Sequence, residues 1–370
     1  MAAPPRPQTP RPIEVNAPPQ ETRPTRAASN VARRLTGFLG RHPILCLLLL
    51  TPGIPEYLSG SSQLTLVVLN PIVFLLFLAL NLGLYGPGVL LIREAAIRWR
   101  KGWATIILLG TAYSILEEGI ALSTYFYPKA GPVGALGFYG HWLGVNWVWV
   151  AGIVMVHVVF SISLPILLHG YALPAWRGKS LLDRRGIRIA FLVLAADVVL
   201  LALLVRSTYQ FFPGVGLIGA SLVAILALTV LAYRVPATLL RPVPGPPRLP
   251  FVWMGAIGLA LLPGSFLIEG IFGALHAPPR SAILALGLWF AAALFAVRRG
   301  LGDGSSVRHV LAFVLGALLS IMVIGLATEY YLPVVALADL AAFLLVWRLW
   351  RRSPGLAPAV PFWHTRGLAA

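Results

Sequence analysis

Charged side chains are scarce in this sequence. Asp, Glu, Lys and Arg make up 11% of its 370 residues, whereas apolar residues make up 58% and the mean hydropathy is +0.83. Soluble globular domains carry about 25% charged residues, so this composition excludes that class. Many apolar runs reach about 18 residues, enough to cross roughly 30 Å of hydrocarbon. The sequence therefore predicts an all-α polytopic membrane protein, a bundle of about nine or ten transmembrane helices.

Cysteine is nearly absent, and so are the common catalytic motifs. Cys46 is the only cysteine, which excludes an internal disulfide framework, and its surroundings lack the small-residue pattern of a lipoprotein site. The chain has no G-x-x-x-x-G-K-[ST] loop, no H-E-x-x-H pair and no G-x-S-x-G elbow. An ATPase, a soluble-type zincin and a serine hydrolase of that fold are therefore not supported.

Acidic residues are few, so the net charge is +17 and the sequence pI is about 11.0. A basic chain can bind nucleic acid, but here the positions of the cations indicate membrane topology instead. Every Lys and Arg except Lys129, Arg206 and Arg280 falls in the N-terminal tail or in alternate segments between apolar runs. Those segments are 85–102, 170–188, 234–250, 298–308 and 348–370. We expect them on the cytoplasmic side of the plasma membrane, with the lipid bilayer as the partner and no nucleic acid.

Run length places nine membrane spans within a transmembrane domain that covers residues 43–352. The spans are 64–84, 103–126, 146–169, 187–206, 217–234, 252–274, 281–298, 308–328 and 333–350. Residues 353–370 form a short C-terminal tail, which we expect in the cytoplasm.

The first 42 residues are rich in proline and arginine and poor in large apolar side chains. Such a segment cannot bury enough surface to fold, so we predict a disordered basic tail. If this tail is also cytoplasmic, the segment 44–58 must cross or enter the membrane as a short, proline-broken tenth element. The alternative is that the tail is exported.

Residues 85–102 follow the first span and contain four basic residues. The Gly-Pro-Gly at 86–88 predicts a helix break, with a new helix starting at the proline. Glu94 and Arg98 then stand four residues apart on a charged face. We expect an interfacial amphipathic helix on the inner leaflet, the alternative being a basic topogenic loop.

Three tryptophans gather where the third span begins on the outer side. Trp142, Trp147 and Trp149 are typical of an aromatic belt at the membrane interface. We expect His141 and Asn146 to anchor this interface.

Ionisable residues inside the spans fall into two layers. At 1.5 Å per residue, Glu117, Glu118, His157 and Asp197 lie near mid-membrane on three consecutive helices. A second layer, Glu269 and Asp339 in the outer third with Glu329 at the rim, is expected nearer the surface. A charge at the bilayer centre costs roughly 2.5–3.5 kcal/mol on insertion scales, so the pair of adjacent glutamates requires a proton or a cation.

The mid-membrane residues suit divalent-metal chemistry. Zinc takes histidine nitrogen and carboxylate oxygen, and a catalytic site leaves one position for water. Glu118, His157 and Asp197 would supply three ligands, and Glu117 would serve as general base. Alternatively these groups are structural, with protonated glutamates bonded to Tyr113 or Ser114, His157 to Ser161, and Asp197 to one of them.

A Glu-Glu pair followed about 40 residues later by a histidine resembles the CAAX prenyl protease and bacteriocin-processing family of intramembrane metalloproteases. Within residues 103–206, "EEGIAL" gives Glu117 and Glu118, with Leu122 at the family's arginine position, and "IVMVH" gives His157. Asp197 stands where the third motif has a histidine. The resemblance implies metal-ligand and general-base roles for the glutamates.

A second resemblance concerns the organism and the fold. "LYGPGVLLIREA", "LEEGIA" and "GHWLGVNWVW" look like segments of a set of multi-pass prokaryotic membrane proteins, which implies no particular activity. The excess of arginine over lysine, together with abundant alanine, glycine and proline, is typical of high-GC bacterial coding.

Two functions from different classes follow from these residues. The first is a divergent intramembrane metal-dependent hydrolase or peptidase acting on a membrane-embedded peptide or small molecule. The second is a non-enzymatic protein, either a proton- or cation-linked transporter or a membrane scaffold, in which the mid-membrane acids bind protons or cations and the outer acids line a vestibule.

Overall fold

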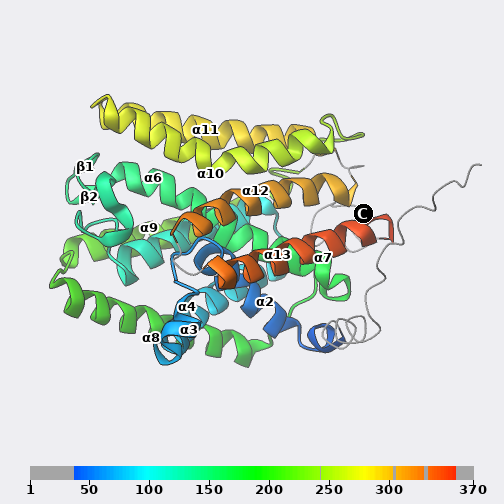
Figure 1. Cartoon of the computed structure of the whole chain (residues 1–370), viewed down its shortest axis with the longest axis horizontal. Helices are drawn as coiled ribbons and strands as arrows, with labels where there is room; N and C mark the ends of the chain where they lie inside the picture. The colour runs from blue at the N-terminus through cyan, green and yellow to red at the C-terminus, as the bar shows by residue number, and fades with distance from the viewer. Residues whose placement is uncertain (1–36, 242, 303–305, 329–331, 356–370) are drawn as a thin grey trace, which may run out of the picture. The chain divides into compact units, whose positions relative to one another are not determined.

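The computed structural model describes residues 37–241, 243–302, 306–328 and 332–355 (Figure 1). Nearly all of the predicted N-terminal tail, most of the C-terminal tail and Glu329 lie outside these ranges. The chain divides into two units, 1–41 and 42–370, and the helices described below belong to the second unit.

The second unit is a nearly all-α bundle, as the sequence predicts. Among the described residues, nine helices are long and apolar enough to cross a membrane, one for each predicted span. They are α4 (Pro71–Arg98), α5 continued by η2 (Trp103–Ser114 and Ile115–Ala121), α6–η4–α7 (Trp147–Val156, His157–Ser163 and Leu164–Ala172), α8 (Arg184–Tyr209), α9 (Val215–Arg234), α10 (Phe251–Ala274), α11 (Pro279–Gly300), α12 (Val307–Thr328) and α13 (Leu332–Arg352).

Short elements complete the bundle. A two-stranded hairpin, β1 (His141–Trp142) with β2 (Val145–Asn146), precedes α6, and Asn146 caps that helix by accepting from the backbone N–H of Trp149 at 3.0 Å. Further short elements are α3 (Leu66–Leu69) and the 3₁₀ turns η3 (Gly131–Gly137), η5 (Pro174–Trp176) and η6 (Ser353–Gly355).

The predicted tenth element is present as α2 (Pro43–Pro52) followed by η1 (Gly53–Tyr57). Its fifteen residues rise about 22 Å, less than the roughly 30 Å of a hydrocarbon core. The element packs against α4 and α7, where His169 Nε2 lies 3.0 Å from the Pro43 carbonyl oxygen. It therefore packs on the bundle with one face, while Leu45 and Leu49 on the other face stay exposed.

Burial separates inner helices from outer ones. Most of α5 and α12 is buried, whereas only 11–17% of the spans formed by α8, α9, α11 and α13 is buried. Leu192 and Val199 on α8, Leu226 on α9 and Leu288 on α11 are each more than half exposed. Helices that are apolar all round yet uncovered on one side suit a lipid environment, so the fold supports a multi-pass membrane protein.

Small residues allow the closest helix contacts. A Cβ added at Gly316 of α12 would lie 2.0 Å from the Gly255 carbonyl oxygen of α10, and one added at Gly258 would lie 2.2 Å from the Phe313 carbonyl oxygen. Backbones that approach this closely are typical of membrane helix pairs. In the figure, α10 also runs alongside α11 (Figure 1).

The predicted helix break at residues 86–88 is wrong, because α4 continues without interruption from Pro71 to Arg98. Gly86 and Gly88 are packing positions: a Cβ would lie 2.3 Å from a Leu48 side-chain carbon at the first and 2.3 Å from the Tyr113 ring at the second. These glycines therefore admit neighbouring side chains against a continuous helix.

The predicted amphipathic helix is wrong for a related reason, and the loop of the alternative is confined to residues 99–102. Arg93 and Glu94 are each 1% exposed, so the charged pair lies inside the bundle. Glu94 accepts from Arg98 Nε at 3.1 Å and from the Leu181 backbone N–H at 2.6 Å. Arg93 donates to the Trp176 carbonyl oxygen at 2.8 Å. The charges thus fasten the segment 173–183 to the end of α4, and we call this contact the Glu94 latch.

Candidate functional site

Three π-helical segments lie in the described part of the chain, in η1, η2 and η4. Each contains a backbone bond of i→i+5 spacing, for example from the Leu122 N–H to the Glu117 carbonyl oxygen at 2.8 Å. Single π turns within α-helices are rare and occur frequently at functional sites. Two of them, η2 and η4, carry the acidic and imidazole groups of one buried cluster, and Glu56 of η1 is joined to that cluster through Tyr85.

The centre of the cluster is formed by Glu117 and Glu118 of η2 with His157 of η4. One ligand atom from each lies within 4.8 Å of the others, and all three residues are buried. His157 Nε2 lies 2.9 Å from Glu118 Oε1, and His157 Nδ1 lies 3.6 Å from Glu117 Oε2. The structure therefore brings together three of the four residues that the sequence predicts near mid-membrane, and this group could hold a metal ion.

Neighbouring side chains orient Glu118 and His157. The Ser161 hydroxyl lies 3.1 Å from His157 Nδ1, which confirms the pairing that the sequence allowed. Thr124 donates its hydroxyl to Glu118 Oε2, and Trp149 Nε1 donates to Thr124 Oγ1 at 3.2 Å. Trp149 is 9% exposed, so its predicted place in an aromatic belt is wrong: it points inward and supports the cluster.

Glu117 is joined to a further acid through Tyr85 of α4. The Tyr85 hydroxyl contacts Glu117 Oε1 and lies 2.6 Å from Glu56 Oε1 in η1. A tyrosine hydroxyl carries one proton, so it can donate to only one of the two carboxyl groups. The other carboxyl must itself be protonated to complete its bond. At least one shared proton therefore belongs to the Glu56–Tyr85–Glu117 chain.

This chain leads from the buried cluster to the surface of the bundle. Glu56 Oε2 accepts from the Ser62 hydroxyl at 2.7 Å, and the Asn81 amide donates to that hydroxyl at 2.8 Å. Glu56, Ser62 and Asn81 are all partly exposed, whereas Tyr85 and Glu117 are buried. Hydrogen-bonded polar groups on α4 and η1 thus connect the buried cluster with partly exposed positions of the bundle.

Asp197 lies on α8 and does not belong to the three-residue group. Its Oδ1 packs on α4, where a Cβ at Gly83 would lie 2.7 Å away, and its buried Oδ2 accepts no hydrogen bond from a described residue. Glu269, from the expected outer layer, packs its carboxylate against Gly152 of α6, 2.0 Å from a Cβ built there. Asp339 Oδ1 on α13 is buried without a hydrogen bond from the described residues.

The residues that sequence reasoning missed are Glu56, Tyr85 and Thr124. A signal for two of the π segments is nevertheless present, because Pro55 lies within η1 and Pro165 lies two residues after the end of η4. A proline inside an apolar helix cannot make the i→i−4 bond, which favours a local change of helical pitch.

Comparisons of this chain with protein-family models, with curated proteins and with solved structures find no match. The resemblance to the CAAX protease family therefore stays a prediction that rests on Glu117, Glu118 and His157.

Proposed function

We propose that this protein is a membrane-embedded hydrolase that uses a divalent metal ion, with zinc as the best fit, held by Glu117, Glu118 and His157. The observation that carries the proposal is the meeting of two carboxylates and one imidazole within 4.8 Å inside the bundle. Oxygen and nitrogen donors of this kind suit zinc, and three protein ligands leave a fourth position for water or substrate. The substrate class is a peptide or small molecule that reaches the site from the membrane.

The donor set fits such an ion for a second reason. Glu117 Oε2 is buried and accepts no hydrogen bond from any described residue, although it faces His157. An unsatisfied buried carboxylate oxygen is costly, and a cation is the partner that would satisfy it. In this proposal Glu117 takes the ligand place that the sequence predicted for Asp197.

A bound divalent ion would supply a Lewis acid that polarises a carbonyl oxygen and makes water acidic near neutral pH. Glu117 connects this chemistry to the proton chain, because its Oε2 faces the ligand group while its Oε1 faces Tyr85. A proton taken up at Glu117 Oε1 can pass through the Tyr85 hydroxyl to Glu56. The base role predicted for Glu117 thus includes a route by which the proton leaves.

The test is the metal content of the purified, detergent-solubilised protein, measured by mass spectrometry of the elements. We expect about one zinc ion per chain in the wild type and little in Glu118→Ala or His157→Ala, because each loses a ligand. Glu269→Ala is the matched control, since it removes a buried acid on another helix and should keep the metal. A folded wild type that stays metal-free after zinc is supplied would overturn the proposal.

A second candidate, proton-linked transport, is favoured by one specific observation. The chain of groups from Ser62 through Glu56 and Tyr85 to Glu117 joins partly exposed positions to the buried cluster, as a proton site in a transporter requires. It predicts that proteoliposomes take up protons with a substrate and that Glu117→Gln abolishes this. Metal-free protein with such uptake would replace the hydrolase proposal.

A further inference from the structure

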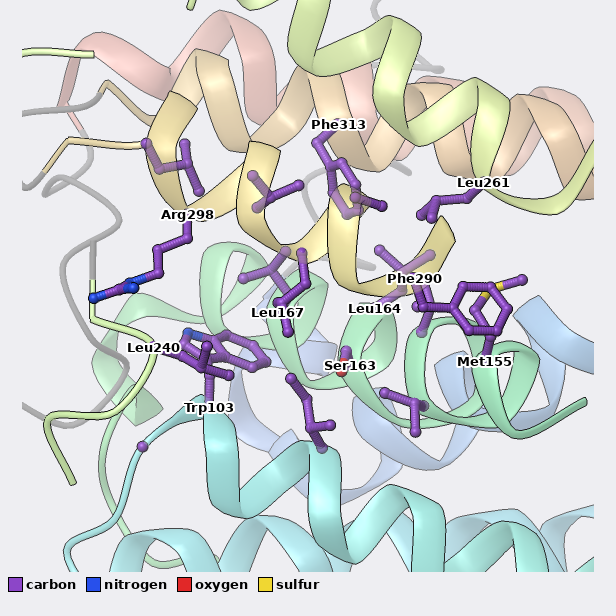
Figure 2. Close-up of a pocket in the computed structure, with 18 of the residues that line it drawn as sticks. Trp103, Met155, Ser163, Leu164, Leu167, Leu240, Leu261, Phe290, Arg298 and Phe313 are labelled. Carbon is purple, nitrogen blue, oxygen red and sulfur yellow. The ribbon is translucent and has the colours of Figure 1, made fainter. Parts of the chain in front are cut away.

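A cavity of about 330 Å³ opens between α5, α11 and the α6–η4–α7 helix, and residues of α10 and α12 complete its lining (Figure 2). This volume is within the usual range of ligand pockets. Its walls are almost entirely apolar: Ile107, Val158, Leu167 and Leu261 are typical of the lining.

The cavity is elongated and has two different ends. Arg298 lies at one end, beside Leu240 and Trp103, while Met155 and Phe290 lie at the other (Figure 2). Phe290 and Arg298 are eight residues apart on α11, which corresponds to about 12 Å along the helix axis. A long apolar slot thus ends at a cation.

A second arginine belongs to the same end. Arg241 also lines the cavity, and Arg298 Nε donates to the Arg241 backbone carbonyl oxygen at 3.1 Å. This bond fixes the segment 235–241 against α11. Both arginines come from segments that the charge pattern places on the cytoplasmic side, at the level of the lipid headgroups.

The cavity is separate from the Glu117–Glu118–His157 cluster, although the two share a wall. Val158, Val159 and Ser163 of η4 line the cavity, whereas His157 and Ser161 of the same segment take part in the cluster. On the other wall, Trp103, Ile107 and Thr111 present one face of α5. No residue of the cluster is among those that line the cavity.

We propose that this cavity binds one acyl chain of an anionic bilayer phospholipid, with its phosphate against Arg298. A soluble anion would contact the Arg298 guanidinium but would gain nothing from the apolar slot, and a neutral chain would gain nothing from the cation. An anionic lipid uses both features, because burial of the chain and charge-assisted bonds to arginine act on the same molecule. The inference does not depend on the hydrolase proposal.

The experiment is native mass spectrometry of delipidated protein in detergent, titrated with phosphatidylglycerol or with phosphatidylcholine of the same acyl chains. We expect one tightly held phosphatidylglycerol per chain and about tenfold weaker retention of phosphatidylcholine, since only the former carries a net negative charge. Arg298→Gln should lower phosphatidylglycerol retention about tenfold, a typical effect of losing one charge-assisted contact.

Two further variants make the result decisive. Ala293→Trp places a bulky ring in the slot and should remove the bound lipid even though both arginines remain. Arg299→Gln removes the neighbouring exposed charge on α11, which does not line the cavity, and should leave retention unchanged. Equal retention of the two lipids, equal effects of the two arginine variants, or retention of free palmitate in preference to phosphatidylglycerol would overturn the proposal.

Discussion

The Tyr85 hydroxyl has one proton and two acidic neighbours, Glu56 and Glu117. Removing it in Tyr85→Phe leaves two buried or partly buried carboxyl groups with one donor fewer. We expect a loss of about 1.5–3 kcal/mol in the free energy of unfolding, the range for bonds to charged groups. Thermal unfolding of the two proteins in detergent measures this loss of stability.

Tyr233→Phe on α9 provides the control for this prediction, because the Tyr233 side chain is more than half exposed. It should change the midpoint of unfolding little. Similar midpoints for the two variants would mean that Tyr85 does not join Glu56 to Glu117 in the folded protein.

Glu117, Glu118 and His157 could be predicted from the sequence because charge in an apolar run is conspicuous and helical rise gives depth. Depth alone does not give direction around the helix axis, and for that reason Asp197 appeared to belong with them although it packs on Gly83. Glu56 is missed because it lies in the short, proline-broken segment 44–58, outside the nine predicted spans. Its role depends on Tyr85, which is distant in sequence.

At the scale of elements, the Glu94 latch determines where the segment 173–183 lies. Glu94→Ala removes the acceptor of Arg98 and of the Leu181 N–H, and leaves the buried Arg93 without its carboxylate. Breaking a buried ion pair in this way costs about 3–5 kcal/mol. We therefore expect faster trypsin cleavage at Arg177 and Lys179, detected by mass spectrometry of the fragments.

Asp183→Asn is a matched control for the latch. It removes a nearby acid but keeps a side-chain oxygen that can cap α8, where Asp183 now accepts from the Gly186 N–H at 2.7 Å. Its cleavage pattern should resemble the wild type. Slow cleavage of Glu94→Ala would show that other contacts hold the segment.

Glycines allow the backbones of α10 and α12 to approach closely where the two helices cross. Gly316→Ala would force its methyl group against the Gly255 backbone, so we expect destabilisation of about 1–3 kcal/mol, as for other overpacked sites. Gly287→Ala on α11 meets open space and should be neutral or stabilising by up to about 1 kcal/mol, the helix propensity difference. The midpoints of thermal unfolding compare the two variants. Equal midpoints would contradict the close contact between the α10 and α12 backbones.

Apolar run length predicted all nine spans, since lipid permits little besides helices. The end of the first span was misplaced because the Gly-Pro-Gly at 86–88 usually interrupts helices in water. In this bundle the small residues accommodate Leu48 and Tyr113, and neighbouring contacts stabilise the helix around Pro87. Charges at Arg93 and Glu94 then enter the bundle instead of lying at its surface.

At the scale of the whole molecule, the distribution of Lys and Arg predicts the orientation in the membrane. In a Cys46→Ala background, Lys179→Cys should react with a membrane-impermeant maleimide only after cells are permeabilised. Lys129→Cys should react in intact cells, because its segment is expected outside. Both side chains are exposed, so accessibility from water decides the outcome. The reverse labelling pattern would invert the topology.

Because of the π-helical turns, the number of residues in η2 and η4 determines which way Glu118 and His157 face. A π turn accommodates one residue more than an α turn, so a related chain lacking one residue in η2 or η4 could still form a continuous helix. Everything beyond the deletion would then be rotated by about 100° around the helix axis. Glu118 and His157 would face different neighbours even with every acid and imidazole retained. Counting residues between motifs is therefore as informative about relatives of this chain as matching the motifs themselves.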